Sequence, residues 1–376
     1  MIRETFGLIF AGEEIIELRE LVALRAVGAL PIGGRYRVID FPLSSMVHSG
    51  IRNIAVIADR NYNSLMDHLG SGKSWDLARK SDGLFILPPY SNRDNQGGYR
   101  GLVEALKGSM DYMRRAKQEY CVISGCHTIY NRVFDDMLQA HIDKGADITV
   151  LYNKSEQEPY VDNIRYEDVR FDIDRGGRVR EVEFNPRTSK LRCFSMDTYI
   201  VRKDTLIYLV EESIARGEYF FVNNLIRGNL DRLNILGFEH KGYVSRIWSI
   251  PSYFKANMDF LDSGLQQSLF RSRNRILTKL KDEVPAKYSA TANVKNSIIA
   301  NGCVIEGEVE NSVIFRGVFI GRGAVVKNSI IMEGSEIGEN SELDNVVIDK
   351  NVAARSRCRL IGSKTFPVII PKGATV

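Results

Sequence analysis

The stretch GLIFAGEEIIELRELVALRAVGALPIGGRYRVIDFPL, residues 7–43, decides how the first half of the chain folds. It begins with a short apolar strand that runs into Ala11 and Gly12, where a phosphate-binding loop would continue with glycines and end in basic residues. Here the loop continues with Glu13, Glu14 and two isoleucines. The block PIGGRYRVIDFPL then follows intact. The sequence therefore keeps the surroundings of a nucleotide site and loses the groups that would hold phosphates.

Length, composition and charge are those of an ordinary globular protein. A chain of 376 residues is too long for one compact core, so we expect two domains. Apolar residues make up 44% and charged residues 26%, as in globular domains generally. The formal net charge of +4, without a long run of Lys or Arg, argues against nucleic acid as a partner, because binding a phosphate backbone needs a concentrated basic face.

The N-terminus and the cysteines favour a cytoplasmic location. The first residues lack the layout of a signal peptide, and no apolar run is long enough to cross a bilayer, so we expect no membrane contact. The five cysteines are odd in number, scattered, and form no CxxC pair: Cys121, Cys126, Cys193, Cys303 and Cys358. This pattern is typical of reduced thiols and argues against a disulfide framework and a zinc site.

Up to about residue 260, short β-rich runs alternate with helix-like segments. This alternation predicts a mostly parallel sheet with helices on both faces. Ligands of such sheets bind at the carboxyl ends of the strands, so the loops after residues 7–11 and 120–124 are the places to look for chemistry. The predicted strands are 7–11, 35–40, 53–58, 84–87, 120–124 and 146–151, and the predicted helices are 61–69, 101–116 and 132–145.

From about residue 290 the pattern changes to a repeat. The tetrapeptides NSII, NSVI, NSII and NVVI begin at Asn296, Asn311, Asn328 and Asn345, in steps of 15, 17 and 17 residues. Inside each unit apolar residues return about every six positions, with small turn residues between them. This period predicts a parallel β-helix of triangular coils, of which about four are visible.

These patterns divide the chain into three parts. We expect an α/β domain at 1–261, a connector rich in Arg and Lys that begins with a helix at 262–292, and the β-helix at 293–376. An antiparallel sandwich is the alternative for the last part, but it requires alternation of apolar and polar residues at period two, which is weak there.

Five blocks of the sequence are similar to one enzyme family. PIGGRYRVIDFPLSSMVHSGIRNIAVIA, residues 31–58, resembles almost position by position a block of the glucose-1-phosphate adenylyltransferases (ADP-glucose pyrophosphorylases). YRGLVEAL, SGCH, SMDTYIV and SYFKANMDFL, which begin at positions 99, 124, 195 and 252, extend the resemblance over essentially the whole chain. The resemblance implies an α/β nucleotidyltransferase domain, with a Rossmann-like mixed sheet of the GT-A type, followed by a left-handed parallel β-helix of hexapeptide repeats.

Members of this family let a sugar phosphate attack the α-phosphorus of ATP and expel pyrophosphate. That chemistry needs glycine amides and cations around the triphosphate, carboxylates that hold magnesium, and a cation on the sugar phosphate. The family's glycine-rich loop ends in an Arg. The matching run here places Glu13 and Ile15 at glycine positions and Glu17 at the Arg position. We therefore expect this segment to form an amphipathic helix in place of a phosphate loop, since Ile15, Leu18, Leu21 and Val22 fall at helical spacing.

The other phosphate-contacting positions that the resemblance identifies are replaced as well. Val27 stands for a Lys, Asn185 for the sugar-phosphate Lys, Cys126 for a metal-positioning Asp, and Arg246 for the second metal carboxylate. A thiol is a poor ligand for magnesium, which prefers hard oxygen donors. Each lost metal or oxyanion contribution is worth about several kcal/mol, so these changes together with Glu17 would remove measurable turnover.

The resemblance then implies a non-catalytic regulatory subunit, similar to the D-type subunits of glycogen biosynthesis in Gram-positive bacteria. Such a subunit binds a catalytic adenylyltransferase homologue in a heterotetramer and raises its activity or alters its response to effectors. The isolated chain could also form a homo-oligomer, and the resemblance leaves this alternative open. We expect no cofactor of its own, with magnesium only in the catalytic partner.

Two sets of residues follow from the resemblance. The expected remnant of the nucleotide pocket consists of Ala11, Gly12, Arg25, Tyr99, Gly101, Glu104 and Gly125. The candidates for binding a phosphorylated metabolite or nucleotide effector are Arg35, Arg37, Arg52 and Arg246, with a solvated basic loop as the alternative for the first three.

Other functions stay open. An active nucleotidyltransferase with a displaced site would release pyrophosphate from ATP and glucose-1-phosphate, and a pure scaffold would bind no ligand. An acyltransferase on the β-helix is disfavoured, because those enzymes commonly use a His within the coils and the last His here is His240. A nucleophilic pair of Cys126 and His127 is disfavoured as well, because adjacent residues on an extended loop point apart.

Overall fold

The computed structural model describes residues 4–89, 98–154, 168–186 and 188–376. The chain forms two compact units. The first holds the residues up to Glu14 together with Phe41–Val244, and the second holds Ile15–Asp40 together with Ser245–Val376. The second unit thus combines the β-helix with a segment close to the N-terminus. The three-part division expected from the sequence stays a prediction.

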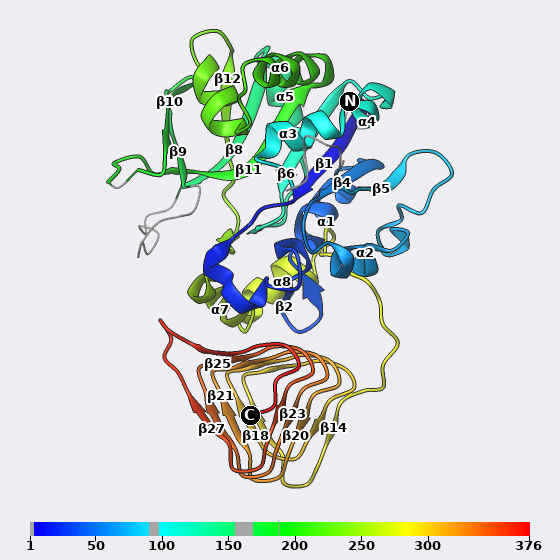
Figure 1. The fold of residues 1–376 in the computed structure, drawn as a ribbon, viewed down its shortest axis with the longest axis vertical. Coiled ribbons are helices and arrows are strands. Elements are labelled where there is room, and N and C mark those ends of the chain that lie inside the picture. The colour runs from blue at the N-terminus through cyan, green and yellow to red at the C-terminus, as the bar shows by residue number, and fades with distance from the viewer. Residues whose placement is uncertain (1–3, 90–97, 155–167, 187) are drawn as a thin grey trace. The chain divides into compact units, whose positions relative to one another are not determined.

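The first unit is built on one mixed sheet (Figure 1). Its strands lie in the order β10-β9-β11-β6-β1-β4-β5, with β8 paired to β11 and β12 paired to β8. β5, β4, β1 and β6 are parallel neighbours, whereas β11 is antiparallel to β6 and β8. This arrangement confirms the Rossmann-like mixed sheet. The strands of this sheet are β1 Thr5–Ala11, β4 Asn53–Ala58, β5 Gly83–Leu87, β6 Tyr120–Gly125, β8 Ile148–Lys154, β9 Val169–Ile173, β10 Val179–Phe184, β11 Cys193–Arg202 and β12 Ile235–Glu239, whereas the short strand β7 Thr128–Ile129 lies outside it.

Helices cover both faces of this sheet because successive side chains of a strand point to opposite sides. Phe6 and Leu8 of β1 share a buried core with side chains of α3, α4 and α6. Gly7 points the other way, where a Cβ would lie 2.5 Å from the sulfur of Met46 on α1. The predicted helices are all present, although the second is divided at Ser109. The helices are α1 Asp40–His48, α2 Asn63–Leu69, α3 Leu102–Gly108, α4 Met110–Arg115, α5 Asp135–Asp143 and α6 Lys203–Ala215, with short turns η4 Lys73–Trp75, η5 Phe221–Ile226 and η6 Arg227–Asn229.

The strand predicted at 35–40 is wrong for most of its length. Only Tyr36–Arg37 (β3) is extended, paired with Pro31–Ile32 (β2) in a hairpin, and α1 begins at Asp40. Gly33 and Gly34 between the two strands have φ of 59° and 81°, a left-handed conformation that glycine adopts without steric cost. The turn formed by the two glycines therefore outweighs the β-rich composition of the residues after it.

The amphipathic helix predicted for the segment after Gly12 is also wrong. A 3₁₀ segment, η2, covers only Ile16–Leu21 and is broken at Arg19, whose φ is 47°. Ile15, Leu18 and Leu21 are buried. Their spacing of three residues suits a 3₁₀ turn, which has three residues per turn, better than an α-helix.

The second unit contains the predicted left-handed parallel β-helix. It consists of three sheets of five parallel strands each, which is one coil more than the four repeats visible in the sequence. The strands are β14 Lys287–Tyr288, β17 Val304–Ile305, β20 Phe319–Ile320, β23 Glu336–Ile337 and β26 Ala353–Ala354 in the first sheet, β15 Asn293–Lys295, β18 Glu308–Glu310, β21 Val325–Lys327, β24 Glu342–Asp344 and β27 Arg359–Ile361 in the second, and β16 Ile298–Ile299, β19 Val313–Ile314, β22 Ile330–Ile331, β25 Val346–Ile348 and β28 Val368–Ile370 in the third.

An Asn turns the same corner of four successive coils, and in the first three of them a Ser follows it. The Asn residues that begin the repeats, Asn296, Asn311, Asn328 and Asn345, have φ between 41° and 53°, the left-handed region that Asn tolerates better than most residues. The hydroxyl of the following Ser accepts a hydrogen bond from the next coil, as Ser312 Oγ does from Ser329 N at 3.0 Å. The tetrapeptide is therefore a turn signal and a link between coils at once.

A buried ion pair joins the segment 15–40 to the β-helix within this unit. Nη2 of Arg25 lies 2.8 Å and 2.9 Å from the two carboxylate oxygens of Asp349. The side chains of Arg25 and Asp349 are only 4% and 1% exposed. Such a pair is costly to break from one side, because the remaining charge would stay buried. The other elements here are η3 Val27–Ala29, β13 Ser245–Arg246, α7 Ile250–Asp259 and α8 Ser263–Phe270.

We expect Asn328→Ala to lower the free energy of unfolding by about 1–2 kcal/mol. Ala tolerates the left-handed conformation less well, and the 2.8 Å hydrogen bond from Asn328 Nδ2 to Asp344 is lost. Asn328→Gly is the matched control, since it loses the same hydrogen bond but keeps the backbone conformation. Urea unfolding followed by circular dichroism ranks the three proteins. A glycine variant less stable than the alanine variant would contradict this explanation.

Candidate functional site

The carboxyl ends of three neighbouring parallel strands meet at one edge of the first unit's sheet. Phe10 of β1 lies opposite Gly125 of β6, and Ala11 lies opposite Ala58 of β4. The loops that begin with Gly12, Asp59 and Cys126 therefore leave the sheet at the same edge. This is where ligands of parallel sheets bind, so the predicted location of the site is retained.

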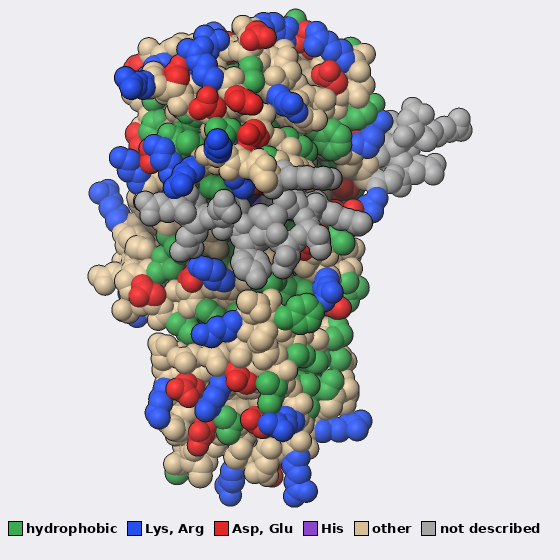
Figure 2. All heavy atoms as spheres, turned by 90° about the vertical axis from the view of Figure 1, so that its left-hand side faces the viewer, with side chains coloured by type: hydrophobic (Ala, Val, Ile, Leu, Met, Phe, Trp, Pro, Cys, Tyr) green, Lys and Arg blue, Asp and Glu red, His purple; other side chains and the backbone are tan. Residues whose placement is uncertain are grey.

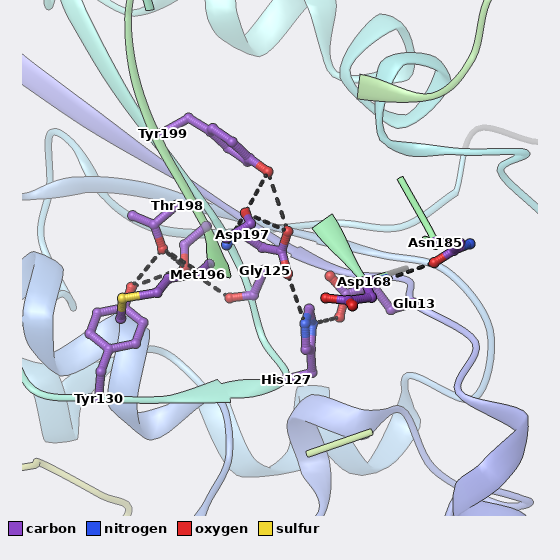
Figure 3. A network of polar contacts seen from close by, with 12 residues as sticks. Glu13, Gly125, His127, Tyr130, Asp168, Asn185, Met196, Asp197, Thr198 and Tyr199 are labelled. Carbon is purple, nitrogen blue, oxygen red and sulfur yellow. Dashed lines mark hydrogen bonds and ion pairs between the residues drawn. The ribbon is translucent and has the colours of Figure 1, made fainter. Parts of the chain in front are cut away.

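At this edge the side chain of His127 lies between two carboxylates (Figure 3). Oε2 of Glu13 is in contact with Nδ1, and Oδ2 of Asp197 lies 2.9 Å from Nε2. The His127 side chain is 2% exposed. Glu13 comes from the loop after β1, His127 from the end of β6 and Asp197 from β11. We call these three residues the carboxylate–histidine triad.

Asp197 is held in place by a local irregularity of β11. Pairing of β11 with β8 shifts in register between Ser195 and Tyr199, and Asp197 has a φ of 47°. The hydroxyl groups of Tyr199 and Ser195 donate to Oδ1 of Asp197 at 3.2 Å and 3.3 Å. The other carboxylate oxygen is thereby directed at His127. This orientation does not depend on Glu13.

The triad carries one positive and two negative charges at neutral pH. Burial alone would lower the pKa of His127, but the carboxylates of Glu13 and Asp197 outweigh it and raise the pKa to about 10. The ring is therefore an imidazolium, with one nitrogen in contact with Glu13 and the other 2.9 Å from a carboxylate oxygen of Asp197. The net charge of −1 repels a phosphate ester instead of attracting one.

The raised pKa predicts that the triad loses its stabilising effect at alkaline pH. The folded pKa of about 10 lies above the unfolded value of 6.5, so the contribution is complete below pH 6.5 and is lost between pH 6.5 and 10. The difference in melting temperature between the wild type and His127→Gln should therefore shrink over this range. A difference that stays constant from pH 6.5 to 10 would show that His127 is not charged in the folded protein.

Three glycines of the pocket remnant are closed off by protein atoms. A Cβ on Gly125 would lie 2.7 Å from Oε1 of Glu13, and one on Gly101 would lie 2.4 Å from the carbonyl oxygen of Tyr219. A Cβ on Gly12 would lie 2.7 Å from the ring of Phe10. The close approach that these glycines permit is thus used by neighbouring parts of the same unit. Ala11, the last residue of β1, is buried.

Tyr99 and Glu104 of the same remnant make polar contacts within the unit. The backbone N–H of Tyr99 donates to Asp59 Oδ2 at 3.2 Å, and Glu104 forms an ion pair of 2.6 Å with Arg100. Burial raises the pKa of Asp59. Sequence reasoning missed Asp59 and Asp197. Asp197 stands inside the quoted block SMDTYIV, but only the fold brings it to His127.

Asn185 and Cys126 also have clear positions in the first unit. Asn185 adopts a φ of 48°, and its Oδ1 accepts a 2.7 Å hydrogen bond from the backbone N–H of Asp168 (Figure 3). This hydrogen bond links the residue before β9 to the residue after β10. Cys126 is fully buried. Both replacements have structural consequences here, and their link to lost catalysis stays a prediction.

The remaining candidate site residues, which are the other substituted family positions, Arg25 and the effector candidates, lie on the second unit, apart from Arg52. Val27 is buried in η3, Glu17 is half-buried on η2, and Arg246 is half-buried on β13. Arg25, placed in the pocket remnant by the resemblance, forms the buried ion pair with Asp349. The structure thus gives Arg25 a stabilising role in the second unit, and its part in the pocket stays a prediction.

The effector candidates differ in their surroundings. Arg35 is exposed and stacks on Tyr36, with 5.5 Å between its guanidinium carbon and the ring centroid. Arg37 donates a hydrogen bond to the carbonyl oxygen of Ala29. Arg52 belongs to the first unit, where its nearest carboxylate contact is Asp76 at 4.0 Å.

The residues at the strand ends do not fit a magnesium ion. Within residues 4–89, 98–154, 168–186 and 188–376, no group of three or more His, Cys, Asp and Glu side chains is arranged to hold a metal. Glu13 and Asp197 lie on opposite sides of an imidazolium, and the neighbouring donor is a buried thiol.

Two further observations bear on partners. Among the helices that the structure describes, none has the length and apolar character needed to cross a bilayer. On the face shown in Figure 2, Lys and Arg side chains are interspersed with Asp and Glu and form no continuous basic surface. Both agree with the expectations of no membrane and no nucleic acid, which stay predictions.

Comparison with known proteins gives matches to both units. Residues 6–263 match the nucleotidyl transferase family, and residues 283–364 match the GlmU-like C-terminal hexapeptide family. The chain is 36% identical over 359 residues to the glycogen biosynthesis protein GlgD of Bacillus subtilis, with 95% of this chain and 92% of that protein covered. It is 39% identical over 330 residues to GlgD of Geobacillus stearothermophilus, with 87% and 84% covered. It is 33% identical over 333 residues to the glucose-1-phosphate adenylyltransferase of Clostridium perfringens, with 86% and 83% covered.

Proposed function

Because this chain belongs to the nucleotidyl transferase family, in the group of the GlgD proteins and glucose-1-phosphate adenylyltransferases, we propose that it is a non-catalytic regulatory subunit of a glucose-1-phosphate adenylyltransferase in glycogen biosynthesis. The observation that carries the proposal is the carboxylate of Glu13 on His127, at the strand ends where a triphosphate would need cations and open backbone amides. A net negative charge at that edge opposes the chemistry that the family performs.

The proposed mode of action is through a partner. The chain binds a catalytic homologue in a heterotetramer in the cytoplasm, and it favours the partner's active arrangement by binding it more tightly than the inactive one. Magnesium is held only by that partner. The alternative is an active nucleotidyltransferase with a displaced site, which the five substitutions at Glu17, Val27, Cys126, Asn185 and Arg246 disfavour.

The test is to assay the chain alone and mixed with a catalytic glucose-1-phosphate adenylyltransferase. Alone, with ATP, glucose-1-phosphate and magnesium, it should release no pyrophosphate above background. In the mixture it should elute as a complex in size exclusion and change the partner's kcat or KM several-fold, saturating at a fixed ratio. Absence of both a complex and a kinetic change would contradict the proposal. Turnover by the isolated chain would favour the alternative.

We also propose that the effector binds at a group of cations on the second unit. Arg316 is half-buried, and both burial and the charge of Arg35 lower its pKa. Burial and the charge of Arg37 likewise lower the pKa of Lys350, against the pull of Glu333 at 2.8 Å. Cations that destabilise one another in this way are relieved by a bound anion such as a phosphorylated metabolite. This supports Arg35 and Arg37 as candidates, while Arg52 and Arg246 stay predictions.

We expect Arg316→Gln to weaken binding of inorganic pyrophosphate to the isolated chain about 10–100-fold. This corresponds to losing one hydrogen bond to a charged group, about 1.5–3 kcal/mol. Arg322→Gln is the matched control, because Arg322 is an exposed arginine on a neighbouring turn of the β-helix. Titration calorimetry provides the affinities. Equal effects of the two substitutions would contradict a site at Arg316.

A further inference from the structure

The position of the Glu13 carboxylate is that of an anion bound between two strand ends. One of its oxygens contacts Nδ1 of His127. The other lies 2.7 Å from the point where a Cβ on Gly125 would be. The carboxylate therefore covers the backbone at the end of β6 although it comes from the loop after β1 (Figure 3). A bound oxyanion would present two oxygens to the same groups.

The cation that Glu13 contacts is held independently of Glu13. Asp197 lies 2.9 Å from the other ring nitrogen, and Tyr199 and Ser195 hold the Asp197 carboxylate. The side chain of His127 is also only 2% exposed. Removal of the Glu13 side chain would leave a preorganised N–H donor with an open acceptor position.

We propose that His127 is a latent oxyanion-binding group and that Glu13 is an internal anion which occupies it and excludes phosphate. The ligand class is a phosphate or pyrophosphate group. In the wild type the intramolecular carboxylate competes at high effective concentration, so an external phosphate does not displace it. This exclusion concerns the first unit alone and holds whether or not the chain regulates a partner.

The neighbouring acids limit the affinity of the uncovered site. Glu14, Asp59 and Asp197 stay near the strand ends and oppose an incoming anion. The gain in phosphate affinity therefore comes from one charge-assisted hydrogen bond to His127 and from the loss of the negative charge of Glu13. A gain of at least tenfold in affinity is expected, the fold-change that about 1.5 kcal/mol provides.

The experiment compares Glu13→Gly with Glu14→Gly in the full-length chain. Glu14 is the next residue of the same loop and its side chain is 72% exposed, with Arg60 at 3.9 Å. Both variants lose one carboxylate and gain one glycine, but only Glu13 contacts His127. Each is titrated with inorganic pyrophosphate without a divalent cation, and binding is followed by calorimetry and by ³¹P line broadening. All variants carry Arg316→Gln, so that the proposed effector group does not contribute.

Three results decide the proposal. Glu13→Gly should bind pyrophosphate at least tenfold more tightly than Glu14→Gly and the wild type, and adding His127→Gln should abolish the gain. Equal affinities of the two glycine variants would overturn the proposal, as would a gain that persists without His127. If Glu13→Gly does not fold, Glu13→Ala and Glu14→Ala are compared with the same criteria, since alanine also removes the carboxylate that covers His127 without adding backbone freedom.

Discussion

An imidazolium held between two carboxylates is the interaction on which the first unit's site depends. It joins the loop after β1, the end of β6 and the irregularity of β11, three places far apart in the sequence. Burial makes each of the three charges costly alone, so each needs the others. The edge of the sheet where the family binds nucleotides is thus stabilised by the protein's own ions, and its fold persists without a ligand.

The second unit is stabilised by a different principle, which is repetition. Three successive repeats use a left-handed Asn to turn and a Ser hydroxyl to meet the next coil, so the same local chemistry occurs several times along one corner. The buried pair of Arg25 and Asp349 then ties the segment 15–40 to this stack. Arg25, which the family resemblance places in the nucleotide pocket, therefore stabilises the second unit in this chain.

Local sequence patterns predicted most of the fold, but they did not predict the contacts between residues far apart in the sequence. The run at 53–58 is β4 residue for residue, and the Asn residues of the repeats occupy the corners. The helix predicted after Gly12 is wrong because the spacing of Ile15, Leu18 and Leu21 suits both an α-helix and a 3₁₀ turn, and the sequence does not show the break at Arg19. Glu13 and His127 are 114 positions apart, so no spacing rule could pair them. Asp197 reaches His127 because of a register shift in β11, and the sequence around Asp197 does not predict that shift.

The loop after β1 is fastened very close to the strand from which it leaves. β1 ends at Ala11, and Glu13 already contacts His127, so Gly12 alone spans the distance between the sheet and the contact. A Cβ on Gly12 would lie 2.7 Å from the ring of Phe10 and 2.8 Å from Cβ of Asp59. A side chain at this one position would therefore shift the backbone that delivers the acid, and it would disturb the imidazole without touching it.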